Sequence, residues 1–365
     1  MSFFPIPQTG CTASGSEAVA LGSGCIASGN QSVALGQLCT ASALNATAIG
    51  GFNVASAFGA TALGESNTSS ADSTFTAGDN NVASAYGASC LGVGNTVASQ
   101  FSTACGQNNS ISSGTDYSFA TGTFNTINDL NAPGAAGTAI AMGTNNTCSN
   151  YMTMAIGNTC IATGDTSFAW GTLCSATNAE TFAWGSGCTA SGTNSMAYGV
   201  NCLSVANSAC ARGVYAKATI PGQDAFSSQR FAALAAGISQ TSVVTQVGST
   251  PGAGAGEGVE LAGGGTVLTL TDSRTYAVKY TVAVSGAGPL SRMFSGELVV
   301  RRTGGVSTIV ASGTQVSLGD AGAVSWTLTP TIGVVPDRLY FAFNTVATTT
   351  ATKIVARVEL TEIAF

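Results

Sequence analysis

The sequence predicts an all-β protein: a narrow parallel β-roll with a 14-residue repeat, followed by an antiparallel β-sandwich or jelly-roll-like domain. Three observations support this fold class. A glycine recurs every 14 residues through the first part of the chain, small and large side chains alternate around each of these glycines, and all eleven basic residues lie at or beyond Arg212. With 45% hydrophobic and only 8% charged residues among 365, the chain also lacks the composition of a disordered protein.

The repeat is defined by glycines that run from Gly22 to Gly106 and from Gly143 to Gly213 in steps of 14, with Gly122 between the two series. The residue two before the glycine is Ala in 12 of 14 copies, and the residue four before it is always Ala, Ser or Thr. The residues one and three before it are usually large. This period of two predicts a strand. A second short alternating run in each copy completes one coil of two strands and two tight turns.

Eleven residues before the glycine, most copies carry either Asn or Cys. Stacked Asn side chains are predicted to hydrogen-bond along the roll, as amides do in other stacked sheets. The Cys residues are predicted to be small buried fillers, because stacked parallel Cβ vectors suit neither a disulfide nor a tetrahedral metal site. The positions are Cys11, Cys25, Cys39, Asn53, Asn67, Asn81, Asn95, Asn146, Cys160, Cys174, Cys188 and Cys202.

Three segments, Cys25–Gly29, Ser32–Gly36 and Ala60–Gly64, resemble the YadA-like head repeats of trimeric autotransporter adhesins. The resemblance covers about residues 8–213 and implies a trimeric left-handed parallel β-roll solenoid in which three chains pack side by side.

Trimerisation also follows from the repeat itself, because a coil with a small interior cannot bury its large side chains within one chain. The alternative for the aromatic residues is a platform for sugars. The predicted trimer-interface residues are Phe168, Trp170, Phe182, Trp184, Met196 and Tyr198.

Four regions are predicted. Residues 1–10 form an N-terminal attachment segment, 11–213 the YadA-like roll, 214–238 a neck with one short helix, and 239–365 the C-terminal β-sandwich domain. Charge supports a boundary near residue 212, since the chain before it carries eight acidic and no basic residues. Turn-forming residues at 125–137 predict a loop that leaves the roll, which either binds a partner or is a tolerated insertion.

The C-terminal region contains runs rich in Val, Thr, Tyr and Phe, which predict an antiparallel sandwich. It also resembles a β domain found at the C-termini of phage and other viral fibre proteins, and this resemblance implies a virion appendage. The residues that carry it are Ala216–Gln223, Gln229–Phe231, Gln240–Ser242, Phe294–Gly296 and Ile354–Glu362. The predicted strands are 266–271, 274–285, 292–302, 306–312, 323–329, 338–344 and 353–361.

The function predicted from these features is that of a non-enzymatic homotrimeric fibre on the virion surface, on tail or head, assembled in the host cytoplasm. The N-terminal segment would attach to other virion proteins, and the C-terminal domain would bind a host-surface glycan or protein. Candidate receptor contacts lie in two predicted loops, at Gly286, Pro289, Thr331 and Asp337.

Composition limits the alternatives. The absence of histidine removes Ser-His-Asp and Cys-His catalysis, and a net charge of −6 disfavours a nucleic-acid partner. No cofactor, metal or membrane insertion is expected. One alternative is a glycan-degrading tailspike enzyme that uses paired carboxylates, for which Asp165 and Glu180 are candidates on adjacent coils. The other is a fragment of a bacterial trimeric adhesin.

Overall fold

The chain folds into two compact units, residues 1–181 and 182–365. All regular elements among the described residues are β-strands, and none of these residues form a helix long and apolar enough to cross a membrane. Residues 1–8 of the predicted N-terminal attachment segment at 1–10 lie outside the described part. The computed structural model describes residues 9–128, 137–228, 239–249, 268–270, 273–285, 291–319, 327–334, 337–344 and 353–364.

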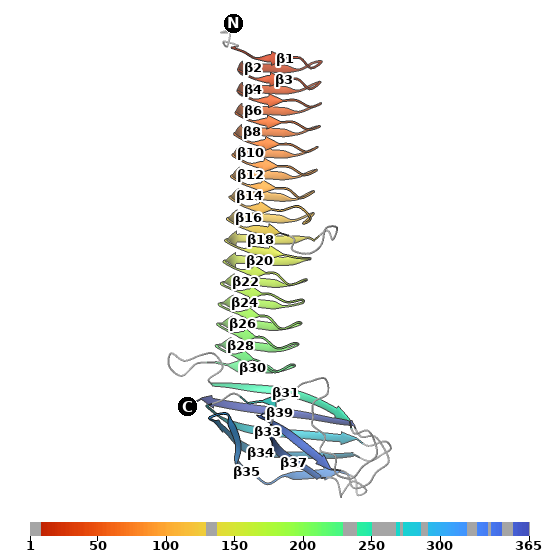
Figure 1. The fold of residues 1–365 in the computed structure, drawn as a ribbon, viewed down its shortest axis with the longest axis vertical. Coiled ribbons are helices and arrows are strands. Elements are labelled where there is room, and N and C mark those ends of the chain that lie inside the picture. The colour runs from red at the N-terminus through yellow and green to blue at the C-terminus, as the bar shows by residue number, and fades with distance from the viewer. Residues whose placement is uncertain are drawn as a thin grey trace. The chain divides into compact units, whose positions relative to one another are not determined.

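The first unit is the predicted parallel β-roll, in which each coil contributes one long and one short strand (Figure 1). Val19 opposes Val33 and Leu21 opposes Leu35, so neighbouring coils pair in a register of 14 residues. The long strands are β2 (Val19–Ser23), β4 (Val33–Gln37), β6 (Thr47–Gly51), β8 (Thr61–Glu65), β10 (Phe75–Asp79), β12 (Ser89–Val93), β14 (Thr103–Gln107), β16 (Phe119–Thr123), β18 (Ala139–Thr144), β20 (Thr153–Asn158) and β22 (Phe168–Thr172).

The short strands form a second parallel sheet across a narrow interior. The Ala residues of the two walls, such as Ala34 on a long strand and Ala41 on a short one, are completely buried. The short strands are β1 (Thr12–Ala13), β3 (Ile26–Ala27), β5 (Thr40–Ala41), β7 (Val54–Ala55), β9 (Thr68–Ser69), β11 (Val82–Ala83), β13 (Thr96–Val97), β15 (Ser110–Ile111), β17 (Thr126–Asn128), β19 (Thr147–Ser149), β21 (Ile161–Ala162) and β23 (Ser175–Ala176).

The glycine that ends each long-strand motif is required by the stacking. Gly64 has a φ of +112°, and a Cβ added there would lie 2.1 Å from the carbonyl oxygen of Gly78 on the next coil. Only glycine avoids both the backbone strain and this clash, because it has no Cβ. The 14-residue glycine period therefore records the contact between one coil and the next.

The predicted asparagine ladder is present and longer than expected. Asn81 Nδ2 donates to Asn67 Oδ1 at 2.9 Å, and the backbone N–H of Asn95 donates to Asn81 Oδ1 at 3.0 Å. Asn109 and Asn125 also belong to it. Sequence spacing missed them because they lie 13 and 18 residues before their glycine partners, Gly122 and Gly143.

The cysteines at the same ladder position are buried fillers, as predicted, except Cys11 in the first coil, which is half-buried. Cys39 is completely buried, and its thiol donates to the carbonyl oxygen of Gly50 at 3.3 Å, which is the contact that the Asn amides make elsewhere. All eleven cysteines lie within the described residues, and all are free thiols.

Residues 125–128 of the predicted loop at 125–137 belong to the roll. Asn125 is a buried member of the ladder, and β17 continues the short-strand sheet by pairing with β19. Residues 129–136 lie outside the described part. The insertion therefore lengthens one repeat without interrupting the stacking of its strands.

The second unit begins with coils that pair in the same 14-residue register, and these coils continue beyond the boundary expected at residue 213. Gly213 opposes Ser227, and Ala225 occupies the buried position that Ala holds in other coils. On its other side β30 pairs with the antiparallel strand β31 (Ser239–Ser249) in place of a parallel coil, so Ser227 needs no glycine and the repeat ends without its motif glycine. The described part of the predicted neck, 214–228, thus forms strands rather than a helix. These coils contain β24 (Phe182–Ser186), β25 (Thr189–Ala190), β26 (Met196–Val200), β27 (Leu203–Ser204), β28 (Cys210–Val214), β29 (Lys217–Ala218) and β30 (Asp224–Ser227).

The C-terminal region is a pair of antiparallel sheets around one core, as predicted. Alternate residues of the long strands in these sheets point into this core, where the rings of Tyr280 and Phe341 lie 4.8 Å apart. The first sheet contains β31 (Ser239–Ser249), β39 (Lys353–Ala364), β33 (Arg274–Ser285), β34 (Ser291–Thr303), β35 (Val306–Ser312) and β36 (Val316–Gly319). The second contains β32 (Leu268–Thr269), β38 (Asp337–Asn344) and β37 (Thr327–Val334).

A buried polar network joins the last coil of the roll to the first sheet. Gln240 accepts a hydrogen bond from the N–H of Lys217 at 2.8 Å and donates to its carbonyl at 2.9 Å. The same amide donates to Glu362, which also pairs with Arg274. Gln223 donates to Ser242 at 2.8 Å. The network satisfies backbone and side-chain polar groups that would otherwise be buried unpaired.

Candidate functional site

The outward face of the long strands carries a stripe of large apolar side chains, formed in most coils by the residues one and three before the motif glycine. Val19 and Leu21 on β2 are 43% and 38% exposed, and Trp170 on β22 is 46% exposed, whereas Ala34 on the opposite face is fully buried. The interior of most coils is filled by small side chains, with Val97, Ile111 and Ile127 as the larger exceptions, and it has no room for a second row of large ones. We call this face the outward stripe.

The structure places all six predicted interface residues on the outward stripe. Phe168 and Trp170 lie on β22, with their rings edge to face and 6.1 Å apart. On β24, Phe182 and Trp184 repeat this arrangement at 6.4 Å. Met196 and Tyr198 on β26 pair in register with Phe182 and Trp184. Their burial by other copies of the chain stays a prediction.

Within the second unit, the outward stripe runs on through the last coils to the C-terminal sheet. Trp184 opposes Tyr198, Tyr198 opposes Arg212, and Arg212 opposes Phe226. The Arg212 guanidinium lies 5.7 Å from the centre of the Phe226 ring and 2.9 Å from the Asp224 carboxylate. An arginine is thereby accommodated among aromatic side chains with its charge balanced.

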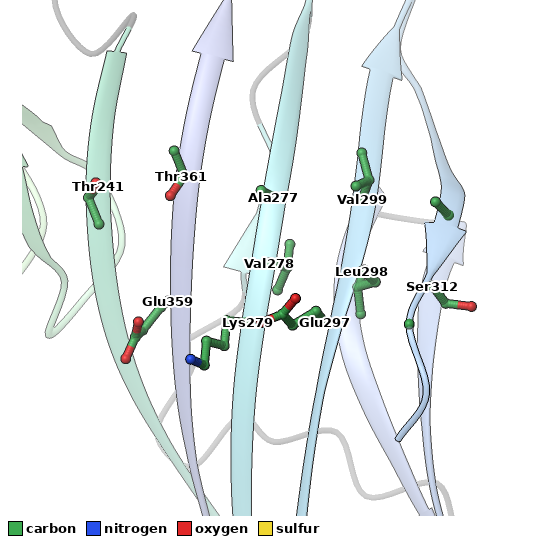
Figure 2. Close-up of a pocket in the computed structure, with 12 residues that line it drawn as sticks. Thr241, Ala277, Val278, Lys279, Glu297, Leu298, Val299, Ser312, Glu359 and Thr361 are labelled. Atoms are coloured by element: carbon green, nitrogen blue, oxygen red, sulfur yellow. The ribbon is translucent and has the colours of Figure 1, made fainter. Parts of the chain in front are cut away.

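A groove of about 400 Å³ lies on the C-terminal sheet, across β31, β39, β33 and β34 (Figure 2). One row of small or apolar residues crosses the strands, and a neighbouring row is charged, with Lys279 opposite both Glu297 and Glu359. Sequence reasoning did not find this groove. The first row contains Thr241, Thr361, Ala277 and Val299.

The predicted receptor contacts are not brought together as a loop cluster. Gly286 and Pro289 lie outside the described residues. Thr331 lies within β37, where it opposes Tyr340, and Asp337 is the first residue of β38. The expected loop at 331–337 is therefore mostly the two arms of a hairpin, because the alternation of β37 continues past Pro330.

A second exposed aromatic row lies at one corner of the roll and was missed. Tyr86 and Phe101 are edge to face with ring centres 5.1 Å apart, and Phe101 stacks on Tyr117 at 5.2 Å. These residues recur five or six positions before the motif glycine, which is the signal that could have revealed them.

The carboxylates considered for glycan cleavage do lie on adjacent coils. The N–H of Glu180 donates to the carbonyl oxygen of Asp165 at 2.8 Å, and both residues are exposed. Within the described part of the chain, no three His, Cys, Asp or Glu side chains are grouped so that they could hold a metal ion.

Comparison with known families identifies one match in the roll. The YadA head domain repeat matches three overlapping segments, residues 13–38, 27–53 and 41–67. No curated protein matches the chain. The matched repeats and the parallel solenoid fit an adhesin-like trimeric fibre, and all three matched segments precede the C-terminal sandwich.

Proposed function

We propose that this chain is a structural, non-enzymatic fibre protein that assembles as a homotrimer through the outward stripe. The observation that carries the proposal is the exposure of large apolar side chains coil after coil, exemplified by Leu21, Trp170 and Trp184. A contiguous apolar surface of this extent is typical of an interaction site. The match to the YadA head repeat supports a trimer over other assemblies.

The energetic scale is sufficient for stable association. Burying the exposed half of one large apolar side chain contributes roughly 1 kcal/mol, half of the value for complete burial. Each coil presents up to two such side chains, and aromatic residues contribute the largest areas. Summed over ten or more coils, this exceeds the cost of about 4–15 kcal/mol for lost translational and rotational freedom.

The fibre is proposed to belong to a virion, attached to other virion proteins through residues 1–10 and displaying the C-terminal sandwich to a host-surface glycan or protein. Support comes from the segments that resemble viral fibre proteins. Three of them, Ala216–Gln223, Gln240–Ser242 and Ile354–Glu362, meet in the polar network between roll and sandwich. A compact domain displayed three times on one fibre would gain avidity from weak single sites.

The outward stripe is tested by placing charge on it. Trp170→Glu combined with Trp184→Glu is expected to convert the trimer into monomers, as measured by sedimentation equilibrium. Leu173→Glu is the matched control, since Leu173 is 60% exposed at a corner of the roll, outside the stripe. A double variant that stays as trimeric as the control would show that another face holds the copies together.

The location is tested by immunogold electron microscopy with an antibody against the C-terminal sandwich. Label at one site on intact virus particles is expected. Label on the surface of bacterial cells that release no particles would instead identify an adhesin and overturn the virion assignment. Release of reducing ends from host polysaccharide by the purified trimer would contradict the non-enzymatic role.

A further inference from the structure

One hydrogen-bonded sheet runs from the last coils of the roll into the C-terminal sandwich. Phe226 on β30 opposes Thr241 on β31, Thr241 opposes Thr361 on β39, and Thr361 opposes Ala277 on β33. Directly opposed residues in a ladder point to the same face. The outward stripe of the roll and the groove on the sandwich therefore belong to a single continuous face.

The burial of these residues shows that the whole row lies on the solvent-exposed face of the sheet. Thr241, Thr361 and Ala277 are exposed, whereas Ser242, Leu360 and Val278, their neighbours along each strand, are buried. Side-chain size falls sharply, from aromatic rings on the roll to Thr and Ala on the sandwich. The small residues create the groove seen in Figure 2.

The charged row beside them contains both signs. Lys279 lies between Glu359 and Glu297 across the sheet, and Glu359 also pairs with Arg357 at 3.1 Å. Every copy of the chain thus presents both a cation and carboxylates at the edge of the groove. A row with both signs of charge can form ion pairs with a neighbouring copy of the chain.

We propose that a second copy of this chain occupies the groove, so that the interface between copies continues from the roll onto the outer face of the sandwich sheet. The proposal rests on the proposed homotrimer. The continuity of the sheet face between the outward stripe and the groove favours a second copy as the occupant. Chains joined along the outward stripe would bring their adjoining sheet faces toward one another. The small Thr and Ala side chains would let these sheets approach closely.

The test compares two introduced thiols in the full-length chain. Ala277→Cys places a thiol in the groove, and Thr329→Cys places one on the exposed side of β37 in the second sheet, on the other side of the core. The rate of reaction with a bulky maleimide is measured for each site by peptide mass spectrometry and normalised to the unfolded chain. Ala277→Cys is expected to react at least tenfold more slowly than Thr329→Cys.

The solution mass of each variant, measured in the same samples, separates the possible failures. A monomeric parent chain would overturn the homotrimer and with it this extension. A trimer in which both thiols react at the same rate would overturn the extension alone, and would show that the groove is open to a different ligand. Protection of Ala277→Cys that disappears in the Trp170→Glu, Trp184→Glu background would support the proposal further.

Discussion

Replacing one asparagine of the ladder should destabilise the roll locally and strongly. Asn81 is completely buried. Its Nδ2 donates to Asn67 Oδ1 at 2.9 Å and to the carbonyl oxygen of Gly92 at 2.7 Å, and its Oδ1 accepts from the N–H of Asn95 at 3.0 Å. One side chain thus connects three coils.

Asn81→Ala would leave the Gly92 carbonyl and the Asn95 N–H buried without these partners. A buried polar group left unpaired costs about 1–3 kcal/mol, so the two together cost roughly 3 kcal/mol. Since 1.4 kcal/mol corresponds to a factor of ten, the Asn95 amide should exchange its hydrogen about a hundredfold faster in native-state exchange experiments.

Asn81→Cys is the matched comparison, because cysteine fills the same ladder position in other coils. The Cys39 thiol donates to a glycine carbonyl at 3.3 Å, and Cys11 Sγ accepts from the N–H of Cys25 at 3.4 Å. Asn81→Cys should therefore lose about half as much stability as Asn81→Ala. Equal exchange rates at Asn95 in the parent chain and in Asn81→Ala would refute the role assigned to the ladder.

Three further predictions concern the glycine motif, the joint and the thiols. Gly64→Ala should destabilise the roll by more than about 2 kcal/mol, seen as a lower thermal midpoint, because of its positive φ and the contact with the next coil. Burial raises the pKa of the Glu362 carboxyl, against the opposing effect of Arg274. Its protonation thus stabilises the fold at acid pH, and this contribution is lost as the pH rises through the raised pKa. The melting temperature of the sandwich should therefore fall as the pH rises from the usual pKa of a Glu carboxyl to the raised pKa of Glu362. Glu362→Gln should make this fall smaller, and an unchanged pH profile would contradict the prediction. Burial raises the pKa of Cys90 to about 12, so at pH 8 iodoacetamide should spare Cys90 in the folded chain; modification as fast as in urea would contradict its burial.

The roll could be predicted from sequence because its register is local. Each coil pairs with the next at a fixed spacing of 14 residues, so glycine and alanine recur visibly. Prediction failed at Asn109 and Asn125, where the spacing between coils changes, and at Ser227, where the last coil lacks the motif glycine. The glycine is needed only where a further parallel coil follows, so the last coil has no glycine that would reveal it in the sequence.

The candidate site was predictable only in part, for a related reason. Alternation along single strands is sufficient to place Trp170 and Trp184 on the outward face, because it depends only on neighbouring residues. The groove depends instead on pairing between distant segments, such as Thr241 with Thr361 and Ala277 with Thr361. Register between strands so far apart in the chain leaves no periodic trace in the sequence.

The central claim is that copies of this chain associate through the outward stripe. Sedimentation equilibrium of the full-length protein over a range of micromolar concentrations tests it most directly. The account predicts a single species of three times the chain mass that does not dissociate on dilution. A stable monomer across that range would contradict it, because the large side chains of the stripe would then remain exposed to water.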